Sequence, residues 1–449
     1  MDPVKIKDNQ VEIVRNLLDG IPNLVKTIEN KSLEQLASEG VFVFPELLKD
    51  SDDLTKDQVI LKGFKDKFST GNVMGFLGFG NEHLVIESRF SNGQDDYFFH
   101  YMLGRVFDIP NLTDLKTGMN REYGFLDYLI FLFPFYLRNA LKKGIYKEYV
   151  LNKYNDSNVK GVIDVSRHIK QNTPFIGKVA YNLREYAYDN DITQLIRHTI
   201  EYIKAKPIGN QIFNRVNDEV QSIVKVTQSY NKLDRSTIID KNLKKTVKHS
   251  FYKEYLSLQR LCLMILRHQQ IQTSTENNKL YGILFDGSWL WEEYIARLVK
   301  NHFYHPMNKS KKHTQYLFAK SAGDIYPDFI GDNREKRIIA DAKYKPSKNI
   351  NGDDYLQLLA YMYRFESNTG FYFYPQNDES NDISIKELEL ISGSTFDSIV
   401  ARDEPGVKVI KLGFPVPMEY KGFEDFEDKI KGIESKYISY IKVNYLEKK

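Results

Sequence analysis

Apolar and polar residues repeat with two different periods along this chain, and the pattern is clearest in its C-terminal third. Three segments carry apolar side chains at helical spacing: residues 287–299, 354–365 and 423–441. Four short runs of apolar β-formers predict strands: residues 326–330, 338–345, 370–375 and 407–415. The gap between the first two runs contains Gly, Asp and Asn, which predicts a hairpin turn. Helices that alternate with strands predict an α/β domain over residues 276–449, after a polar break at 273–278.

The first 110 residues predict a mixed α/β domain. An amphipathic helix is expected over Val11–Leu18 and a short strand over Gly40–Pro45. Residues 72–88 predict a β-hairpin with a Gly-Asn turn.

Glycines at positions 75, 78 and 80 give this hairpin a superficial likeness to a phosphate-binding loop. Such a loop needs a following Lys-Ser/Thr pair and a helix N-terminus, and the sequence has neither there. The run from Gly282 to Gly287 also lacks the lysine. We therefore expect that the chain does not bind or hydrolyse a nucleotide by itself, and we assign it no cofactor-binding residues.

Residues 111–275 predict a mainly helical region. Apolar stripes indicate a buried helix over residues 125–137, a helix over residues 189–203 and a long helix over residues 243–272. Residues 162–169 predict a strand or turn that leads into a helix. Five basic residues on the long helix indicate either a solvated face or a track for DNA phosphates: Lys244, Lys245, Lys248, Lys253 and Arg260.

The strongest chemical signal lies in the C-terminal hairpin. Asp341 and Lys343 are two residues apart on its second strand, so their side chains point to one face. Asp328 lies at the end of the preceding strand, where it can meet them. Two carboxylates hold a hard divalent cation, and a lysine orients or deprotonates an attacking water. Each acid alone is typical of a solvated turn, but the three together predict metal-assisted phosphodiester hydrolysis.

Composition sets wider limits on the function. The chain has 449 residues and a formal net charge of +3, so DNA binding must depend on local patches or on a partner. The single cysteine, Cys262, excludes internal disulfides and cysteine-based zinc sites, and it fits a reducing cytoplasm. No signal peptide or membrane span is expected. His302 and His305 have no third ligand at metal-site spacing, so we assign them no metal.

The hairpin motif resembles the PD-(D/E)xK nuclease family, in the variant whose second acid is Asp. The order of acidic helix, PD strand, DxK strand, Gln/Tyr helix and strand is similar to the nuclease subunits of McrC and LlaJI type. In that family the helix acid follows an aromatic residue, which matches Trp291-Glu292 best. Glu293 is the alternative acid on the same helix.

The resemblance implies a catalytic role for four side chains of the motif. Asp328 and Asp341 would bind Mg²⁺, for which Mn²⁺ can substitute, and the backbone carbonyl of Ala342 would be a third ligand. Lys343 would activate the water, and Glu292 would assist.

Three further residues lie close to the motif. Gln357 and Tyr361 share a helix face and are expected auxiliaries, unless they only form a hydrogen bond on the helix surface. Lys345 is two residues beyond the catalytic lysine, so we expect it to contact phosphate or to be solvated.

The resemblance also implies the biological setting: a DNA endonuclease subunit of an NTP-dependent, McrBC-like or LlaJI-like restriction system. Its partner would be a hexameric AAA+ GTPase that recognises and translocates double-stranded DNA and uses GTP, which this chain does not. Residues 1–110 would bind that partner, residues 111–275 would form the DNA side, and pairing of nuclease domains would allow duplex cleavage. Arg89 and Arg105 lie near the N-terminal hairpin and carry no assigned role.

Two alternatives from other classes stay open. In the first, the chain would be a non-catalytic scaffold that activates the NTPase. In the second, it would be a repair-type nuclease that acts alone. Retention of both acids and the lysine disfavours the scaffold, which has no physical need for them. The long N-terminal half, without a recognisable helicase or zinc module, disfavours the autonomous nuclease.

Overall fold

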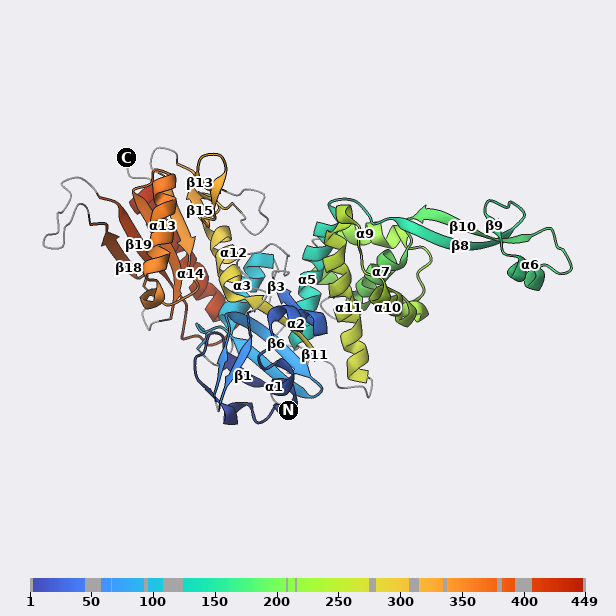
Figure 1. The fold of residues 1–449 in the computed structure, drawn as a ribbon, viewed down its shortest axis with the longest axis horizontal. Helices are drawn as coiled ribbons and strands as arrows, with labels where there is room; N and C mark the ends of the chain where they lie inside the picture. Colours follow the sequence, from blue (N-terminus) through green and yellow to red (C-terminus); the bar gives the residue numbers. More distant parts are fainter. Residues whose placement is uncertain are drawn as a thin grey trace. The chain divides into compact units, whose positions relative to one another are not determined.

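The protein divides into two compact units (Figure 1). The composite unit contains Met1–Arg121 and Asn277–Lys449, and the inserted unit contains Glu122–Glu276. The computed structural model describes residues 3–44, 58–65, 67–92, 96–107, 124–206, 209–214, 216–273, 280–306, 315–333, 337–377, 382–391 and 406–446. The first and third of the three predicted regions therefore share one compact unit.

The first sheet of the composite unit joins strands from both ends of the chain. Its order is β1-β7-β6-β11-β3, with bounds β1 (Val4–Lys7), β3 (Val41–Phe44), β6 (Val73–Phe79), β7 (Glu82–Glu87) and β11 (Leu280–Asp286). β11 pairs antiparallel with β6 and parallel with β3. The predicted strand at Gly40–Pro45 is confirmed over β3, and the predicted hairpin is confirmed as β6 and β7. β11, which falls in the predicted C-terminal region, therefore pairs with strands of the predicted N-terminal region.

The glycines of the β6 strand serve this sheet. Gly75 has a φ of +143°, and a Cβ there would lie 2.1 Å from the carbonyl oxygen of Ile283 in β11. A Cβ at Gly78 would lie 2.4 Å from the Tyr281 ring. Close approach of the β11 backbone explains Gly75, and packing of the Tyr281 ring explains Gly78.

Smaller elements cover this sheet. They are β2 (Ile13–Val14), η1 (Arg15–Leu18), α1 (Pro22–Ile28), α2 (Leu33–Glu39), β4 (Leu61–Phe64), β5 (Lys67–Thr70) and α3 (Tyr97–Phe107). The predicted helix over Val11–Leu18 was wrong, because Ile13 pairs with Phe68 of β5 and only a short 3-10 turn follows. Ile13 and Phe68 are both buried, so tertiary pairing overrides the local helical period.

The second sheet carries the predicted hairpin. Its order is β12-β15-β16-β17-β19-β18, with bounds β12 (Phe303–Tyr304), β15 (Phe329–Gly331), β16 (Ile338–Ala342), β17 (Thr369–Gln376), β18 (Ile385–Glu389) and β19 (Lys408–Pro415). β15 and β16 pair antiparallel, as predicted, and β16, β17 and β19 run parallel. A two-stranded ribbon lies nearby, β13 (Gln315–Phe318) with β14 (Ala322–Ile325).

Helices cover both faces of the second sheet (Figure 1). They are α12 (Gly287–Val299), α13 (Gly352–Arg364) and α14 (Phe423–Ile441). A short 3-10 helix, η5 (Ser347–Asn349), precedes α13, and a π-helical segment, η6 (Lys442–Leu446), follows α14. Alternation along β17 assigns the faces: Tyr372 joins the α13 core, whereas the Phe373 ring lies 6.0 Å from that of Tyr437 in α14. All three helices were predicted within one or two residues.

Helix α12 begins directly where β11 ends. Asp286, the last residue of β11, caps the helix by accepting hydrogen bonds from the amides of Ser288 and Trp289. The fully buried Trp291 donates from Nε1 to the carbonyl of Phe373 at 3.0 Å. Phe98 of α3 packs against the Trp291 ring. Contacts with the first sheet, with α3 and with the second sheet therefore fix the position of α12.

The inserted unit is a helical body with a long β-hairpin (Figure 1). Its elements are α5 (Gly124–Leu141), β8 (Glu148–Asp156), β9 (Val162–Ile163), α6 (Val165–Gln171), β10 (Val179–Ala187), α7 (Asp191–Lys204), α8 (Gly209–Phe213), α9 (Asn217–Val226), η2 (Lys232–Asp234), α10 (Arg235–Lys244), η3 (Ser250–Tyr252) and α11 (Glu254–Thr273). α5 and α7 confirm two predicted helices. No helix in the described ranges is long and apolar enough to cross a membrane.

Two expectations for this unit were wrong. The helix predicted over residues 243–272 begins only at Glu254, so its five basic residues do not form one continuous helical track. The nine-residue strands β8 and β10 were not anticipated, although they pair along their whole length. Tyr149 and Leu151 of β8 are both exposed, so the apolar positions do not mark a buried face.

A buried carboxyl group predicts how stability depends on pH. Asp96 accepts hydrogen bonds from the amides of Ser88 and Phe99, and burial raises its pKa to about 7. Because the folded protein keeps this proton while the unfolded chain loses it near pH 4, stability should fall as pH rises from about 4 to about 7. Asp96→Asn keeps the capping oxygen and should reduce this slope in urea unfolding. The exposed Asp332→Asn is the control, and an unchanged slope in Asp96→Asn would contradict the assignment.

Candidate active site

The β15–β16 hairpin brings together the two predicted aspartates. Asp328 precedes β15, and its Oδ2 accepts a hydrogen bond of 2.8 Å from the amide of Ala342 at the end of β16. Asp341 lies in β16 and is 3% exposed. Lys343 Nζ lies 2.7 Å from Asp341 Oδ2, so both side chains occupy the same face, as the spacing predicted. One hydrogen bond therefore joins Asp328 to the backbone between Asp341 and Lys343, and one ion pair joins Asp341 to Lys343.

The electrostatics of this cluster are those of crowded carboxylates. Burial raises the pKa of Asp328 well above its usual range, and the nearby Glu292 and Asp341 raise it further. Burial also raises the pKa of Asp341, although Lys343 opposes that shift. Two buried carboxyl groups that resist ionisation together would ionise more readily beside a cation.

Lys343 is held in its charged form. Burial lowers its pKa, but Asp341 and Asp328 outweigh burial and raise the pKa above the ordinary value. Its Nζ also donates to Oε1 of Gln357 at 3.1 Å. Gln357 in turn donates to the Tyr361 hydroxyl at 2.9 Å. The two predicted auxiliaries thus form a hydrogen-bonded chain from α13 to the lysine.

Lys345 has a different partner. It donates to both carboxylate oxygens of Asp354, at 2.9 and 2.7 Å. Asp354 also accepts from the amide of Asn351 at the start of α13. Lys345 therefore stabilises the first turn of this helix, and its expected phosphate contact stays a prediction.

The sequence did not identify His305 as a neighbour of the site. Its Nδ1 lies 2.8 Å from the carbonyl oxygen of Asp328, and its Nε2 lies 3.7 Å from Glu292 and 3.8 Å from Glu293. Burial lowers its pKa, but the two glutamates and that carbonyl raise the pKa overall. The only signal for His305 is its place after the edge strand β12, which becomes meaningful once the pairing of β12 with β15 is known.

The residues present fit a hard divalent cation with few protein ligands. Across the described part of the chain, no three His, Cys, Asp or Glu side chains are grouped as a ready metal site. Asp341 Oδ2, despite the nearby ammonium, has no aligned hydrogen-bond donor among the described residues. Mg²⁺ characteristically takes one or two carboxylates and keeps several waters. Asp328, Asp341 and the Ala342 carbonyl suit that donor set.

Paired substitutions should show which helix acid acts at the site. Glu292 raises the pKa of Asp328, whereas Glu293 is not among the main influences on it. Glu292→Gln should therefore lower Mg²⁺-dependent DNA cleavage by about tenfold to a hundredfold, and Glu293→Gln should change it little. The measurement is cleavage rate against Mg²⁺ concentration. Equal losses in the two variants would remove the distinction.

The chain was compared with known protein sequences and solved structures. No curated protein sequence matches the chain. A chain in a half-complex from a tetradecameric assembly of Thermococcus gammatolerans McrB AAA+ hexamers with bound McrC is similar at 15% identity and a TM-score of 0.47, covering 96% of this chain and 100% of that chain. A chain of the Thermococcus gammatolerans McrBC complex is similar at 13% identity and a TM-score of 0.32, covering 66% of this chain and 87% of that chain.

The family assignment rests on the match to a family model. The family model described as the McrBC 5-methylcytosine restriction system component matches residues 68–375, which is more than half of the chain. This range includes both sheets' central strands and every residue of the candidate site. The chain therefore belongs to the family of McrBC 5-methylcytosine restriction system components.

Proposed function

We propose that this chain is the McrC-type, Mg²⁺-dependent endonuclease subunit of a restriction system. The observation that carries the proposal is the convergence of Asp328, Asp341 and Lys343 on one hairpin, with two carboxyl groups of raised pKa. Strained pairs of acids of this kind are typical of functional sites rather than of surface ion pairs. The order of α12, β15, β16, α13 and β17 around the motif supports a PD-(D/E)xK nuclease.

The proposed mechanism gives each side chain one task. Asp328, Asp341 and the Ala342 carbonyl would hold the cation, which lowers the pKa of water and offsets charge on the phosphate. Lys343, whose raised pKa favours the ammonium, would donate to the attacking water or to a phosphate oxygen rather than act as the base. Glu292 would assist from α12.

The partner in this proposal is a McrB-like AAA+ GTPase acting on double-stranded DNA, with pairing of nuclease domains for duplex cleavage. The surface that best suits a protein partner is the outer part of the inserted unit's hairpin. Large apolar side chains are exposed there: Val159, Val162, Ile163, Val165, Ile169, Phe175 and Ile176. Such a concentration of exposed apolar surface is unusual unless it is covered by another molecule. Helix α6 in this region has no buried residue.

Surface substitutions test the partner contact. Val162 is 77% and Phe175 69% exposed, so changing both to Ser should leave the fold intact. We expect that about tenfold more of the variant is needed to stimulate the McrB-like NTPase, because apolar anchor residues dominate contacts of this kind. Leu233→Ser, at an 88% exposed position in the same unit, is the matched control. Normal stimulation by the double variant would move the contact elsewhere, including to residues 1–110.

The function itself is tested by plasmid cleavage. Methylated and unmethylated plasmids are incubated with Mg²⁺ and the chain alone. In a second, complete mixture the McrB-like NTPase and GTP are added. Cutting only in the complete mixture supports the restriction subunit. Cutting by the chain alone supports an autonomous nuclease, and NTPase stimulation without cutting supports a scaffold.

A further inference from the structure

Tyr344 connects the candidate site to the first sheet. It follows Lys343, so its side chain points away from the site. Its hydroxyl lies 2.6 Å from Ser88 Oγ, directly after β7, and donates to the sulfur of Met74 in β6 at 3.3 Å. The ring is 4% exposed. The backbone that carries the lysine is therefore anchored to a sheet built mainly from N-terminal strands.

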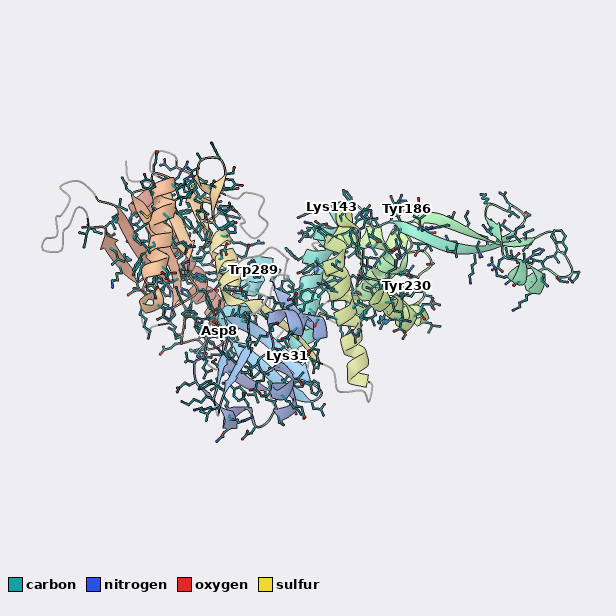
Figure 2. All side chains as sticks on the ribbon, viewed as in Figure 1. Asp8, Lys31, Lys143, Tyr186, Tyr230 and Trp289 are labelled. Atoms are coloured by element: carbon teal, nitrogen blue, oxygen red, sulfur yellow. The ribbon has the colours of Figure 1, made fainter. Side chains whose placement is uncertain are left out.

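Arg89 holds the same ring from another side. Its guanidinium carbon lies 4.9 Å from the centre of the Tyr344 ring. Asp8 fixes Arg89 by accepting from Nε at 2.9 Å, and the guanidinium also donates to Asn72. Figure 2 labels Asp8, whose side chain is fully buried. Arg89 is only 14% exposed, so it serves this internal network and is not presented to a partner.

The network also reaches the helix that carries Glu292. Asn72 accepts from the amide of Gly287 at 3.2 Å and donates to the Ser288 hydroxyl at 2.6 Å. A Cβ at Gly287 would lie 2.7 Å from the Tyr344 ring, so the start of α12 packs directly on that ring. The ends of β6 and β7 thus contact both the DxK strand and the acidic helix.

We propose that Tyr344 is a positioning residue, through which the first sheet sets the location of the Lys343 ammonium relative to Asp341. The assignment of a reaction to Lys343 rests on the proposed function, but the positioning itself does not. Loss of the tyrosine hydroxyl frees one side of the strand end, and the lysine then leaves its contacts with Asp341 and Gln357 for part of the time. Ser88 and Tyr344 act as one element, since their hydroxyls contact each other.

The test compares Tyr344→Phe, Ser88→Ala and the double variant in the full-length chain with its NTPase partner. We expect kcat for DNA cleavage to fall about tenfold in each, with KM unchanged, as for other residues that orient catalytic groups. The double variant should lose no more than either single one. Acetylation of Lys343 by acetic anhydride, followed by mass spectrometry, should become severalfold faster in all three, because a side chain released from Asp341 and Gln357 is more accessible to the reagent than one that is 18% exposed.

The matched control is Tyr437→Phe. Tyr437 is also fully buried in the composite unit, and its hydroxyl donates to the carbonyl of Leu412 at 3.0 Å. The Tyr437→Phe substitution should lower thermal stability while leaving kcat and the Lys343 labelling rate unchanged. Any of three results would overturn the proposal. The Lys343 labelling rate is unchanged in Tyr344→Phe and Ser88→Ala, the losses in kcat add up in the double variant, or labelling in Tyr437→Phe becomes as fast as in the test variants. If the wild-type protein cuts no DNA, the proposed function fails, while labelling still decides whether Tyr344 positions Lys343.

Discussion

Asp341→Asn should abolish Mg²⁺-dependent cleavage without unfolding the protein. The change removes one of two proposed metal-binding carboxylates, and metal stabilisation of the transition state contributes several kcal/mol. We therefore expect a loss of about a thousandfold or more in the cleavage rate. In EDTA at about pH 8, the variant should unfold at the wild-type temperature or at a higher one. The neutral amide that replaces the Asp341 carboxylate removes its repulsion of Asp328, which helps to raise the pKa of Asp328. Lys343 keeps its hydrogen bond to Gln357.

The control for this variant is Asp332→Asn. Asp332 follows β15 on the same hairpin, but its side chain is exposed and belongs to the turn. It should cleave at the wild-type rate. Cleavage by Asp341→Asn at more than about a tenth of that rate would remove Asp341 from the catalytic set.

Lys343→Met should lower turnover by about a hundredfold to a thousandfold, the usual effect of removing one preorganised donor at a reacting centre. It should also move the acidic limb of the pH–rate profile to higher pH. The ammonium opposes the raised pKa values of Asp341 and Asp328, so its removal raises both further. Because metal ligands must be deprotonated, Mg²⁺ binding by the variant should weaken at low pH and recover as the pH rises.

Lys345→Met provides the matched control. It removes the same charge two residues away, where the partner is Asp354 at the start of α13. It should lower stability slightly and shift the pH profile less than Lys343→Met does, because Lys345 has a weaker influence than Lys343 on the pKa of Asp341. An unshifted pH–rate profile in Lys343→Met would show that the lysine does not influence the carboxyl groups as its contacts indicate. If raising the pH is enough to restore the turnover of the variant, the role of the lysine is limited to metal binding.

The C-terminal elements could be predicted because their signals are local. The β15–β16 hairpin, α12, α13, β17, β19 and α14 each show a full helical or strand period, and turn residues or caps mark several of their ends. The spacing of Asp341 and Lys343 then fixes their common face without knowledge of any other strand. The joint pattern was therefore sufficient to predict that Asp328, Asp341 and Lys343 lie together.

The remaining features depend on partners that are distant in sequence. β11 has an ordinary apolar run, and only pairing with β6 and β3 shows that it belongs to the first sheet. His305 becomes a neighbour of Asp328 only after β12 joins the edge of the second sheet. Tyr344 looks like any core tyrosine until Ser88, more than 250 residues earlier, lies against its hydroxyl. Non-local contacts of this kind leave no periodic trace in a single sequence.

These contacts also change how the N-terminal half can be studied. Deleting residues 1–110 would remove Asn72, Ser88 and Arg89, which hold α12 and Tyr344. Such a deletion would disturb the surroundings of α12 and Tyr344 as well as any partner contact. Point substitutions on the exposed hairpin separate the two effects better.

The central position of β11 has a consequence for how the chain folds during synthesis. Residues 73–79 of β6 leave the ribosome about 200 residues before residues 280–286, which pair with them. At roughly 5–20 residues per second, the open edge of this apolar strand waits about ten to forty seconds. The inserted unit can complete its own core during that interval. An unpaired edge rich in Val, Met and Phe is prone to pair with other chains, so nascent chains of this protein should depend on chaperones until β11 arrives.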